Sequence, residues 1–384
     1  MSKPKIAVFI DWFLPGTKAG GPVRSVYSLI SLLKDEFDFY VITANTDLGE
    51  QKPYEDIVPN QLIFKDHVHY FYFNQAQLNN ENTIKLLAEI QPDLIYLNSF
   101  WSLHFSISIV RLKQAHKISA PVLLAPRGML GKGARSLKAF KKNLYLLAAK
   151  QFGWYRGIYF HATQSHEEND IRTVFPVAKI TIAANISSLS PIKNVCEKKE
   201  GHLKLFYLSR IARVKNLHFA LEILKDLAPT IQIDYHIFGN LEDKEYWQEC
   251  EKIISTLPSN IRVELKAEIS FDKIQDTIKH YHCLYLPTLN ENFGHAIVES
   301  LLCGCPVIIS DQTPWNDLQV HSAGYAIALT HRNEFISAII HYASLNNANF
   351  KNESNAAQEY IGKKINTQAT VEQYKHLFND CIKN

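Results

Sequence analysis

The sequence predicts an α/β protein of two domains, each built on a parallel β-sheet. Its 384 residues are enough for two domains of ordinary size. Short apolar runs alternate with amphipathic stretches, which is typical of parallel sheets with helices on both faces. A polar segment at 187–202 interrupts this alternation, which then starts again. We therefore expect an N-terminal domain at 1–186, a linker at 187–202 and a C-terminal domain at 203–365. A last helix at 366–384 follows, and the N-terminal domain is one candidate for its packing partner.

The first half begins with a strand, a loop and a helix. Its apolar runs are expected to be strands, and they lie at Lys5–Ile10, Phe39–Thr43, Leu94–Leu97 and Val122–Ala125. Between the first two, the helix expected at Val23–Leu33 has Val26, Leu29 and Leu33 on one face. The basic N-terminus and first apolar run are similar to a signal peptide, but a run of about five residues fits a buried strand better.

The second half repeats this order. Its strands are expected at Leu203–Leu208, Asp234–Phe238, Cys283–Leu286 and Val307–Ile309. After the first of them, Asn216 is a candidate cap for a helix that carries Leu217, Leu221 and Leu224 on one face. The tail from Lys351 onward is expected to be helical and polar.

Composition excludes several classes of protein. With 46% hydrophobic and 21% charged residues, the chain is not expected to be disordered. The 41 Lys and Arg against 38 Asp and Glu leave a net charge of +3, so nucleic acid is not an expected partner. The six cysteines form no C-x-x-C pair, which disfavours a zinc site or a disulfide framework and favours a cytoplasmic location.

The strongest local pattern is a strand, loop, helix, turn and strand at 286–309. Glu291 lies in the loop, Gly294 at the expected start of the helix and Glu299 within it. A glycine permits close approach of a ligand, and the free amides of a helix start favour an anion. Two carboxylates beside such a site accept hydrogen bonds from sugar hydroxyls. The pattern fits a phosphorylated sugar or a nucleotide sugar, although two glutamates eight residues apart are by themselves more typical of solvated positions.

Two further features suit a diphosphate ligand. Arg210 and Lys215 follow the first strand of the second half, and ligands of parallel sheets bind at the carboxyl ends of the strands. A guanidinium and an ammonium there neutralise phosphate charge, whereas nearby Arg213 is as well explained as a surface cation. In the first half, Gly20–Gly21 precede the helix and permit close backbone approach, though alone they are equally a turn.

In this order and register, these residues resemble the retaining glycosyltransferases of family 4 (glycosyl transferases group 1). That family has the GT-B fold, two Rossmann-like domains whose parallel sheets face each other across a cleft, and includes many bacterial surface-polysaccharide enzymes. The resemblance covers nearly the whole chain. Further segments look like a subgroup of the family, and they are residues 96–101, 125–129, 161–167 and 313–315.

The resemblance implies a role for each matching residue. Arg210 and Lys215 would bind the donor diphosphate, and with Glu291, which would contact the donor sugar, they are the expected catalytic residues. Glu299 would hold the nucleotide ribose. The other expected donor-binding residues are Gly20, Gly21, Gly239, Phe293, Gly294 and His295.

The chain departs from the family on the acceptor side. Many members carry His-x-His-Glu where this sequence has Tyr96-Leu-Asn98-Ser99, so a histidine near the reacting carbon is replaced by Asn98. His104 is a substitute candidate, but at that spacing it fits a helix face equally well. Asn98, His104 and Arg127 are the acceptor-side candidates.

The implied reaction is retaining transfer of a hexosyl group from a nucleotide-diphosphate sugar to a lipid-linked or oligosaccharide acceptor, in surface-polysaccharide (O-antigen, capsule or lipopolysaccharide) synthesis. The chain has no D-x-D triplet, so we expect neither a metal nor another cofactor. Two alternatives stay open. One is a catalytically silent partner that binds a nucleotide sugar, and the other is a GT-B epimerase.

A basic region adds a second expected partner. Residues 94–166 contain eleven Lys or Arg and no Asp or Glu, and residues 130–152 mix cations with apolar side chains. A basic amphipathic helix there suits an anionic membrane surface or a phosphate-rich acceptor, and equally a solvated helix on the core. The expected location is cytoplasmic, with peripheral binding to the inner face of the plasma membrane as one alternative.

Overall fold

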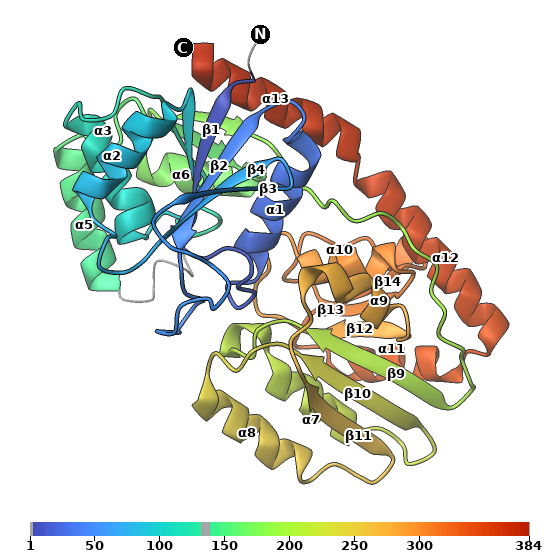
Figure 1. Ribbon diagram of the computed structural model, residues 1–384. Helices are drawn as coiled ribbons and strands as arrows, with labels where there is room; N and C mark the ends of the chain where they lie inside the picture. Colours follow the sequence, from blue (N-terminus) through green and yellow to red (C-terminus); the bar gives the residue numbers. More distant parts are fainter. Residues whose placement is uncertain (1–2, 132–138, 384) are drawn as a thin grey trace. The chain divides into compact units, whose positions relative to one another are not determined.

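The computed structural model describes residues 3–131 and 139–383, and it divides into two compact units (Figure 1). Unit 1 comprises Met1–Ser188 and Thr367–Asn384, and unit 2 comprises Leu189–Asn366. Each unit is a parallel sheet with helices against it, which confirms the predicted α/β class with two parallel sheets.

Unit 1 contains an eight-stranded sheet within the described residues, in the order β3-β4-β2-β1-β5-β6-β7-β8. The strands are β1 (Lys5–Phe9), β2 (Asp38–Ala44), β3 (Leu62–Lys65), β4 (Val68–Phe73), β5 (Leu94–Leu97), β6 (Val122–Leu124), β7 (Tyr159–Ala162) and β8 (Lys179–Ile182). All neighbours are parallel except β3 and β4, which form an antiparallel hairpin at one edge. The central strand β1 is buried because helices cover both faces of a parallel sheet.

The helices of unit 1 include the chain's last one. They are α1 (Gly21–Leu33), α2 (Asn80–Ile90), the π-helix η1 (Leu103–Ile107), α3 (Ser108–Gln114), α5 (Ala139–Gln151), α6 (Ser165–Val174) and α13 (Thr367–Lys383). Phe378 of α13 packs edge-on against Phe37 and Tyr96, with ring centroids 5.4 Å away in both pairs. These buried aromatic contacts hold α13 on unit 1.

Unit 2 contains a six-stranded sheet within the described residues, in the order β11-β10-β9-β12-β13-β14, with every neighbour parallel. The strands are β9 (His202–Leu208), β10 (Gln232–Phe238), β11 (Ile261–Lys266), β12 (Cys283–Leu286), β13 (Val307–Ser310) and β14 (Gly324–Ile327). The helices are η2 (Arg213–Lys215), α7 (Leu217–Lys225), α8 (Lys244–Ile254), η3 (Phe271–Lys273), α9 (Ile274–Ile278), α10 (His295–Leu302), η4 (Gln319–His321), α11 (Arg332–Ser344) and α12 (Asn347–Lys364).

Most of the segment expected as a linker packs on unit 2. Lys198 is only 4% exposed, although a lone buried ammonium is unfavourable. Its Nζ donates to the carbonyls of Lys199 (2.7 Å), Ala343 (2.8 Å) and Leu345 (3.1 Å), around the C-terminus of α11. Burial lowers the pKa of Lys198, and the carbonyls at the helix end stabilise its charge.

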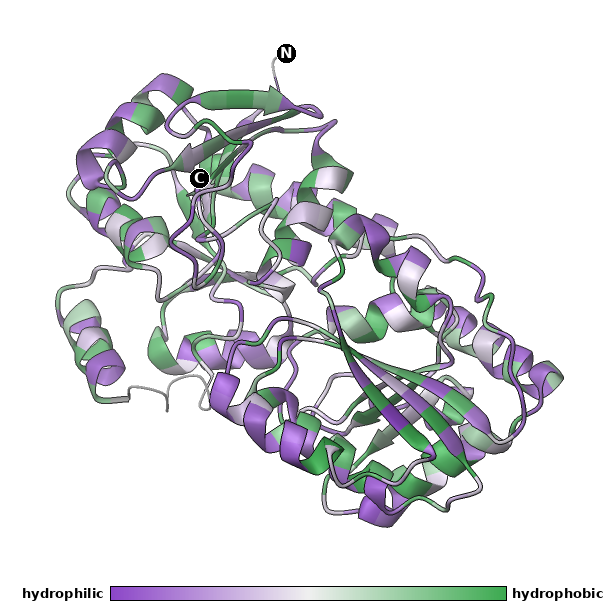
Figure 2. Cartoon of the chain, turned by 60° about the horizontal axis from the view of Figure 1, so that its bottom comes forward, coloured by the Kyte–Doolittle hydropathy of each residue, from purple (hydrophilic) through white to green (hydrophobic). Residues whose placement is uncertain are grey.

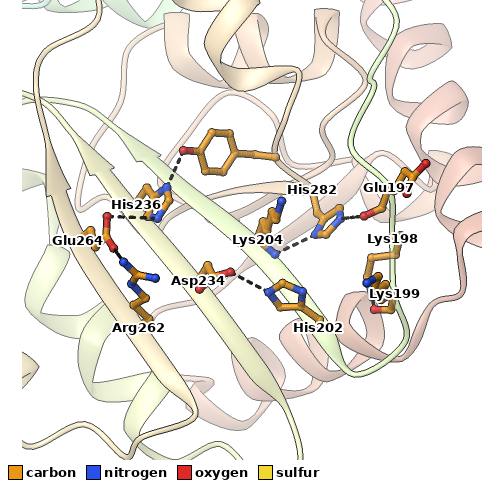
Figure 3. A network of polar contacts seen from close by, with 11 residues as sticks. Glu197, Lys198, Lys199, His202, Lys204, Asp234, His236, Arg262, Glu264 and His282 are labelled. Carbon is orange, nitrogen blue, oxygen red and sulfur yellow. Dashed lines mark hydrogen bonds and ion pairs between the residues drawn. The ribbon is translucent and has the colours of Figure 1, made fainter.

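One side of strands β9–β11 carries a network of polar side chains instead of helices. Hydrophobic and hydrophilic residues alternate along these strands (Figure 2), and α7 and α8 cover the hydrophobic side (Figure 1). On the other side, His202 Nε2 lies 2.8 Å from Asp234 Oδ2, and His236 lies beside Glu264 (Figure 3). His282 accepts from the Lys204 backbone at 2.8 Å. Parallel sheets are usually covered on both faces. In unit 2, strands β9–β11 instead carry paired polar side chains on one face.

Candidate functional site

Lys215 and Glu291 meet at the carboxyl edge of the unit 2 sheet. Lys215 follows β9 and Glu291 follows β12, and these two strands are neighbours. Lys215 Nζ lies 2.6 Å from Glu291 Oε2, with side chains 12% and 19% exposed. The structure therefore brings together two of the three residues expected to be catalytic.

Hydrogen bonds between the two loops hold this pair in place. The Val214 carbonyl accepts from the Leu289 backbone N–H at 2.8 Å and from Thr288 Oγ1 at 3.0 Å. Asn216 occupies the N-cap position of α7, as predicted, but its side chain does not cap the helix. Its backbone is left-handed (φ 59°), its side chain makes no cap bond, and its Nδ2 donates instead to the Pro287 carbonyl at 3.0 Å. Asn216 thus joins the loop after β9 to the loop after β12.

Arg210, the third expected catalytic residue, also follows β9, but it pairs with a different carboxylate. Its guanidinium contacts Glu242, which follows β10, and both side chains are about one-third exposed (35% and 40%). Arg213 forms two hydrogen bonds to Glu249 (2.6 and 2.9 Å) on α8 and lies over the ring of Tyr246. Arg213 is thus a surface cation with carboxylate partners.

Gly294 shapes the start of α10. Its φ of +78° is unfavourable for other residues, and a Cβ here would lie 2.8 Å from Ile297 Cδ1 and 3.2 Å from Glu291 Cγ. Trp315 Nε1 donates to the Phe293 carbonyl at 2.6 Å, which holds the preceding turn. The first amides of α10 therefore lie beside Glu291, in an arrangement that suits an anion.

The other donor-side candidates in unit 2 have distinct environments. Glu299 lies on α10 and is 1% exposed. His295, the first residue of α10, packs against Phe293 with ring centroids 4.8 Å apart. Gly239 follows β10, and a Cβ there would lie 1.8 Å from the Ser209 carbonyl oxygen. Close approach of the chain after β9 and β10 thus requires this glycine, a packing reason that the sequence did not reveal.

In unit 1, the loop after β1 is hydrogen-bonded to Asp47, which follows β2, and it leads into the two candidate glycines. Asp47 Oδ2 accepts from the backbone N–H of Thr17 (3.0 Å) and Lys18 (3.3 Å). Gly20 adopts φ +66° just before α1, and Pro22 follows at the helix start. Gly20 and Gly21 therefore lie at the carboxyl end of β1, where ligands of parallel sheets bind.

Two residues of this loop were missed by sequence reasoning. A Cβ on Gly16 would lie 2.2 Å from the Tyr54 hydroxyl, so the loop needs glycine there. Asp11 also follows β1, and burial raises its pKa, while hydrogen bonds from Ser102 and Ser99 and the nearby His104 lower it. Its position directly after a buried strand was the available signal for Asp11.

The three acceptor-side candidates separate into a pair and an outlier. Asn98 follows β5, is 2% exposed and accepts from Arg127 Nη2 at 2.7 Å. Arg127 follows β6, and its Nη1 donates to Asn185 Oδ1 at 2.7 Å. His104 is exposed on the π-helix η1.

Part of the chain matches the model of a known protein family. Residues 190–360 match the model of the family described as Glycosyl transferases group 1. No curated protein sequence matches the chain significantly.

Solved structures match over nearly the full length. Anabaena HepE in complex with UDP and glucose has a TM-score of 0.70 and 15% identity, covering 98% of this chain and 100% of that one. Sucrose-phosphate synthase from Thermosynechococcus elongatus has a TM-score of 0.70 and 15% identity, covering 99% of each chain. WaaG, a glycosyltransferase involved in lipopolysaccharide biosynthesis, has a TM-score of 0.63 and 11% identity, covering 97% of this chain and 99% of that one. The fold is therefore that of the GT-B glycosyltransferases, as predicted.

Among the described residues, no group of three or more His, Cys, Asp and Glu side chains is arranged to hold a metal ion. None of the helices in the described parts of the chain is long and apolar enough to cross a bilayer.

Proposed function

We propose that the protein is a glycosyltransferase that moves a hexosyl group from a nucleotide-diphosphate sugar to a glycan acceptor, with retention of anomeric configuration. The observation that carries the proposal is the Lys215–Glu291 pair beside the start of α10. It lies within residues 190–360, which match the Glycosyl transferases group 1 model. A cation, a hydroxyl-binding carboxylate and the amides at a helix start are the groups that a sugar diphosphate requires.

The chemistry follows from where charge develops. The bond between the anomeric carbon and the donor phosphate oxygen breaks, and a bond from that carbon to the acceptor oxygen forms. The acceptor proton passes to the leaving phosphate on the same face, which yields a nucleoside diphosphate and retention without a protein nucleophile. Arg210, Lys215 and the first amides of α10 stabilise the negative charge of the leaving group, an effect that is often the largest in catalysis.

Binding the donor requires that existing ion pairs rearrange. The Arg210–Glu242 pair is partly exposed, and such pairs contribute only about 0–1 kcal/mol, so a diphosphate displaces Glu242 easily. Lys215 is more buried and remains beside Glu291, where it binds phosphate while Glu291 accepts from sugar hydroxyls. Glu299 holds the ribose.

The proposed donor is a UDP-hexose. HepE was solved with UDP-glucose as well as with UDP and glucose, which makes UDP-glucose the first donor to test. No metal or other cofactor is assigned, because the sequence has no D-x-D triplet.

The proposed acceptor is linked to a lipid in an anionic membrane, at the cytoplasmic face, within surface-polysaccharide synthesis. Helix α5 supports this proposal, because several of its large apolar side chains are exposed. The exposed residues are Phe140 (81%), Leu144 (58%), Leu147 (66%) and, just after the helix, Phe152 (70%). Lys141, Lys142 and Lys150 lie on the same helix, so α5 carries both parts of a peripheral membrane anchor. Lys132, Arg135 and Lys138 of the predicted basic region lie outside the described residues.

A transfer assay tests the proposal. The protein is incubated with UDP-, GDP-, TDP- and ADP-hexoses and a bacterial lipid extract, and both released nucleoside diphosphate and glycosylated lipid are measured. The proposal expects acceptor-dependent release with one donor. Binding of a donor without any release would instead indicate the silent nucleotide-sugar-binding partner, and a changed sugar without transfer would indicate the epimerase.

A further inference from the structure

The carboxyl edge of the unit 1 sheet contains an arginine whose direct partners are all neutral. Arg127 Nη2 donates to Asn98 Oδ1 (2.7 Å) and to the Tyr96 hydroxyl (2.9 Å), and Nη1 donates to Asn185 Oδ1 (2.7 Å). Tyr374 of α13 also hydrogen-bonds to it. Among the described residues, no carboxylate lies within ion-pair distance of Arg127.

The tyrosine partner is fixed as an acceptor toward Arg127. His161 is fully buried, and burial together with Arg127 lowers its pKa to about 3, so it is neutral. Its Nε2 donates to the Ala183 carbonyl at 2.8 Å, so its Nδ1 accepts from the Tyr96 hydroxyl at 2.8 Å. The phenol oxygen of Tyr96 is therefore left to accept from Arg127 as a neutral group, and Glu167 acts on Arg127 only at longer range than an ion pair.

The nearest carboxylate, Glu167, is occupied elsewhere. Its Oε1 accepts from the Gly128 backbone N–H at 2.6 Å, and its Oε2 accepts from the backbone N–H and hydroxyl of Thr163 (2.7 and 2.6 Å). These bonds hold Arg127 and Gly128 in consecutive left-handed conformations, with φ +56° and +76°. Such strain in a non-glycine residue is typical of functional positions, and here it fixes the direction of the Arg127 side chain.

Arg127 also has unused hydrogen-bonding capacity. Its Nε is buried and has no hydrogen-bond partner. A guanidinium has five N–H donors and is always charged. A buried N–H without an acceptor is unfavourable, and so is a buried charge without a counter-ion. Arg127 as a whole is partly exposed, whereas its Nε is closed to solvent. An oxyanion at the exposed part of the residue would satisfy the charge, and it would reach Nε only after neighbouring side chains move.

We propose that Arg127 is the anion-binding residue of unit 1 and that it takes a phosphate group of the acceptor. This inference rests on the proposed function, because it names the acceptor as a phosphate or diphosphate compound. A guanidinium binds two oxygens of one phosphate in a fork, which suits a phosphate at this edge of the sheet. The donor diphosphate is the other source of the same chemistry.

Exchanging Asn98 for aspartate tests the inference without removing the arginine. Asn98→Asp has the same shape and places a carboxylate where Arg127 Nη2 now donates to a neutral oxygen, so it acts as an internal competitor for the anion. Asn185→Asp does the same at Nη1. The exposed Asn80→Asp at the start of α2 makes the same charge change away from the site and serves as the control.

Binding of inorganic pyrophosphate is measured by calorimetry in the presence of saturating UDP, and UDP binding is measured separately. The inference expects pyrophosphate to bind the UDP complex, and to bind at least tenfold more weakly in Asn98→Asp and Asn185→Asp than in wild type and Asn80→Asp. UDP affinity is expected to change less than twofold, and the melting temperature of both variants is expected to hold or rise.

Two results would overturn the inference. Unchanged pyrophosphate affinity in both folded variants would make Arg127 a structural residue. Pyrophosphate that competes with UDP, with UDP affinity lost in Asn98→Asp, would assign Arg127 to the donor. If the wild type binds no nucleotide, the proposed function is contradicted. Arg127 is then still tested, because pyrophosphate binding can be compared between the nucleotide-free wild type and its variants.

Discussion

Lys215 Nζ and Glu291 Oε2 lie 2.6 Å apart although 76 positions separate them in the sequence. The pair forms because the loops after the adjacent strands β9 and β12 are tied together through Val214, Thr288 and Asn216. Both side chains are mostly buried, with 12% and 19% of their surface exposed. The same two groups are those that the proposed donor requires.

Replacing Lys215 with methionine is expected to lower transfer by roughly 10²–10³-fold, because a positive charge aimed at the leaving diphosphate is lost. The variant also leaves Glu291 without its ion-pair partner, so the free energy of unfolding is expected to fall. Adding Glu291→Gln to Lys215→Met should restore stability but not transfer. Steady-state kinetics and urea unfolding measure the two effects. Transfer by the single variant within threefold of wild type would contradict the assignment.

Gly294→Ala is expected to destabilise the protein by about 1–3 kcal/mol, because the residue has φ +78° and its Cβ would lie 2.8 Å from Ile297 Cδ1. Donor affinity should fall as well, since the first turn of α10 must shift. The control is Gly362→Ala on α12, where a Cβ meets nothing within 4 Å. That substitution should stabilise the helix by about 0.5–1 kcal/mol. Equal effects of the two substitutions in urea unfolding would refute the structural argument.

Stability is expected to fall in acid because of His161 and His282. Burial lowers the pKa of each to about 3, below the ordinary value of 6.5. The unfolded chain therefore binds more protons below pH 6.5, and stability that is complete above this pH decreases as the pH falls toward 3. Each histidine contributes a slope of at most about 1.4 kcal/mol per pH unit. Urea unfolding between pH 4 and 7.5 measures this, and His161→Gln should flatten the slope; an unchanged slope would contradict the assignment.

The exposed apolar residues of α5 are expected to bind membranes. Leu144→Ser with Leu147→Ser should reduce flotation with anionic liposomes several-fold, because each buried leucine contributes about 1.5–3 kcal/mol. Val177→Ser, at a residue that is 96% exposed and lies outside α5, is the control. Higher salt should weaken binding of the wild type. Absence of binding by the wild type at low salt would rule out this role for α5.

Much of the fold follows from local patterns. The strands β5 and β12 have the predicted bounds, and β1 and β9 differ from prediction by one residue, because short apolar runs in a buried parallel sheet have clear ends. The hairpin of β3 and β4 was not predicted. Its turn uses Asp66 and His67 at φ 54° and 66°, which the usual Asn-Gly or Asp-Gly signal does not reveal.

The site was predictable only where its residues share a local pattern. Glu291, Gly294 and Glu299 lie within one strand–loop–helix unit, so their spacing made them candidates. The partners of Arg127 are at least 29 residues away, and no local pattern reports such contacts. The left-handed Asn216 has the same cause, since its side chain bonds to Pro287, 71 residues away. These features depend on contacts between residues that are far apart in the sequence, and a short segment of sequence does not predict such contacts.

The most direct test of the donor site is amide hydrogen exchange with and without the nucleotide sugar that most raises the melting temperature in a panel of UDP-, GDP-, TDP- and ADP-hexoses. We predict slower exchange at residues 209–216 and 291–299, and loss of this protection in Lys215→Met. Protection confined to other segments of unit 2, or unchanged by the substitution, would contradict a site built on Lys215, Glu291 and α10.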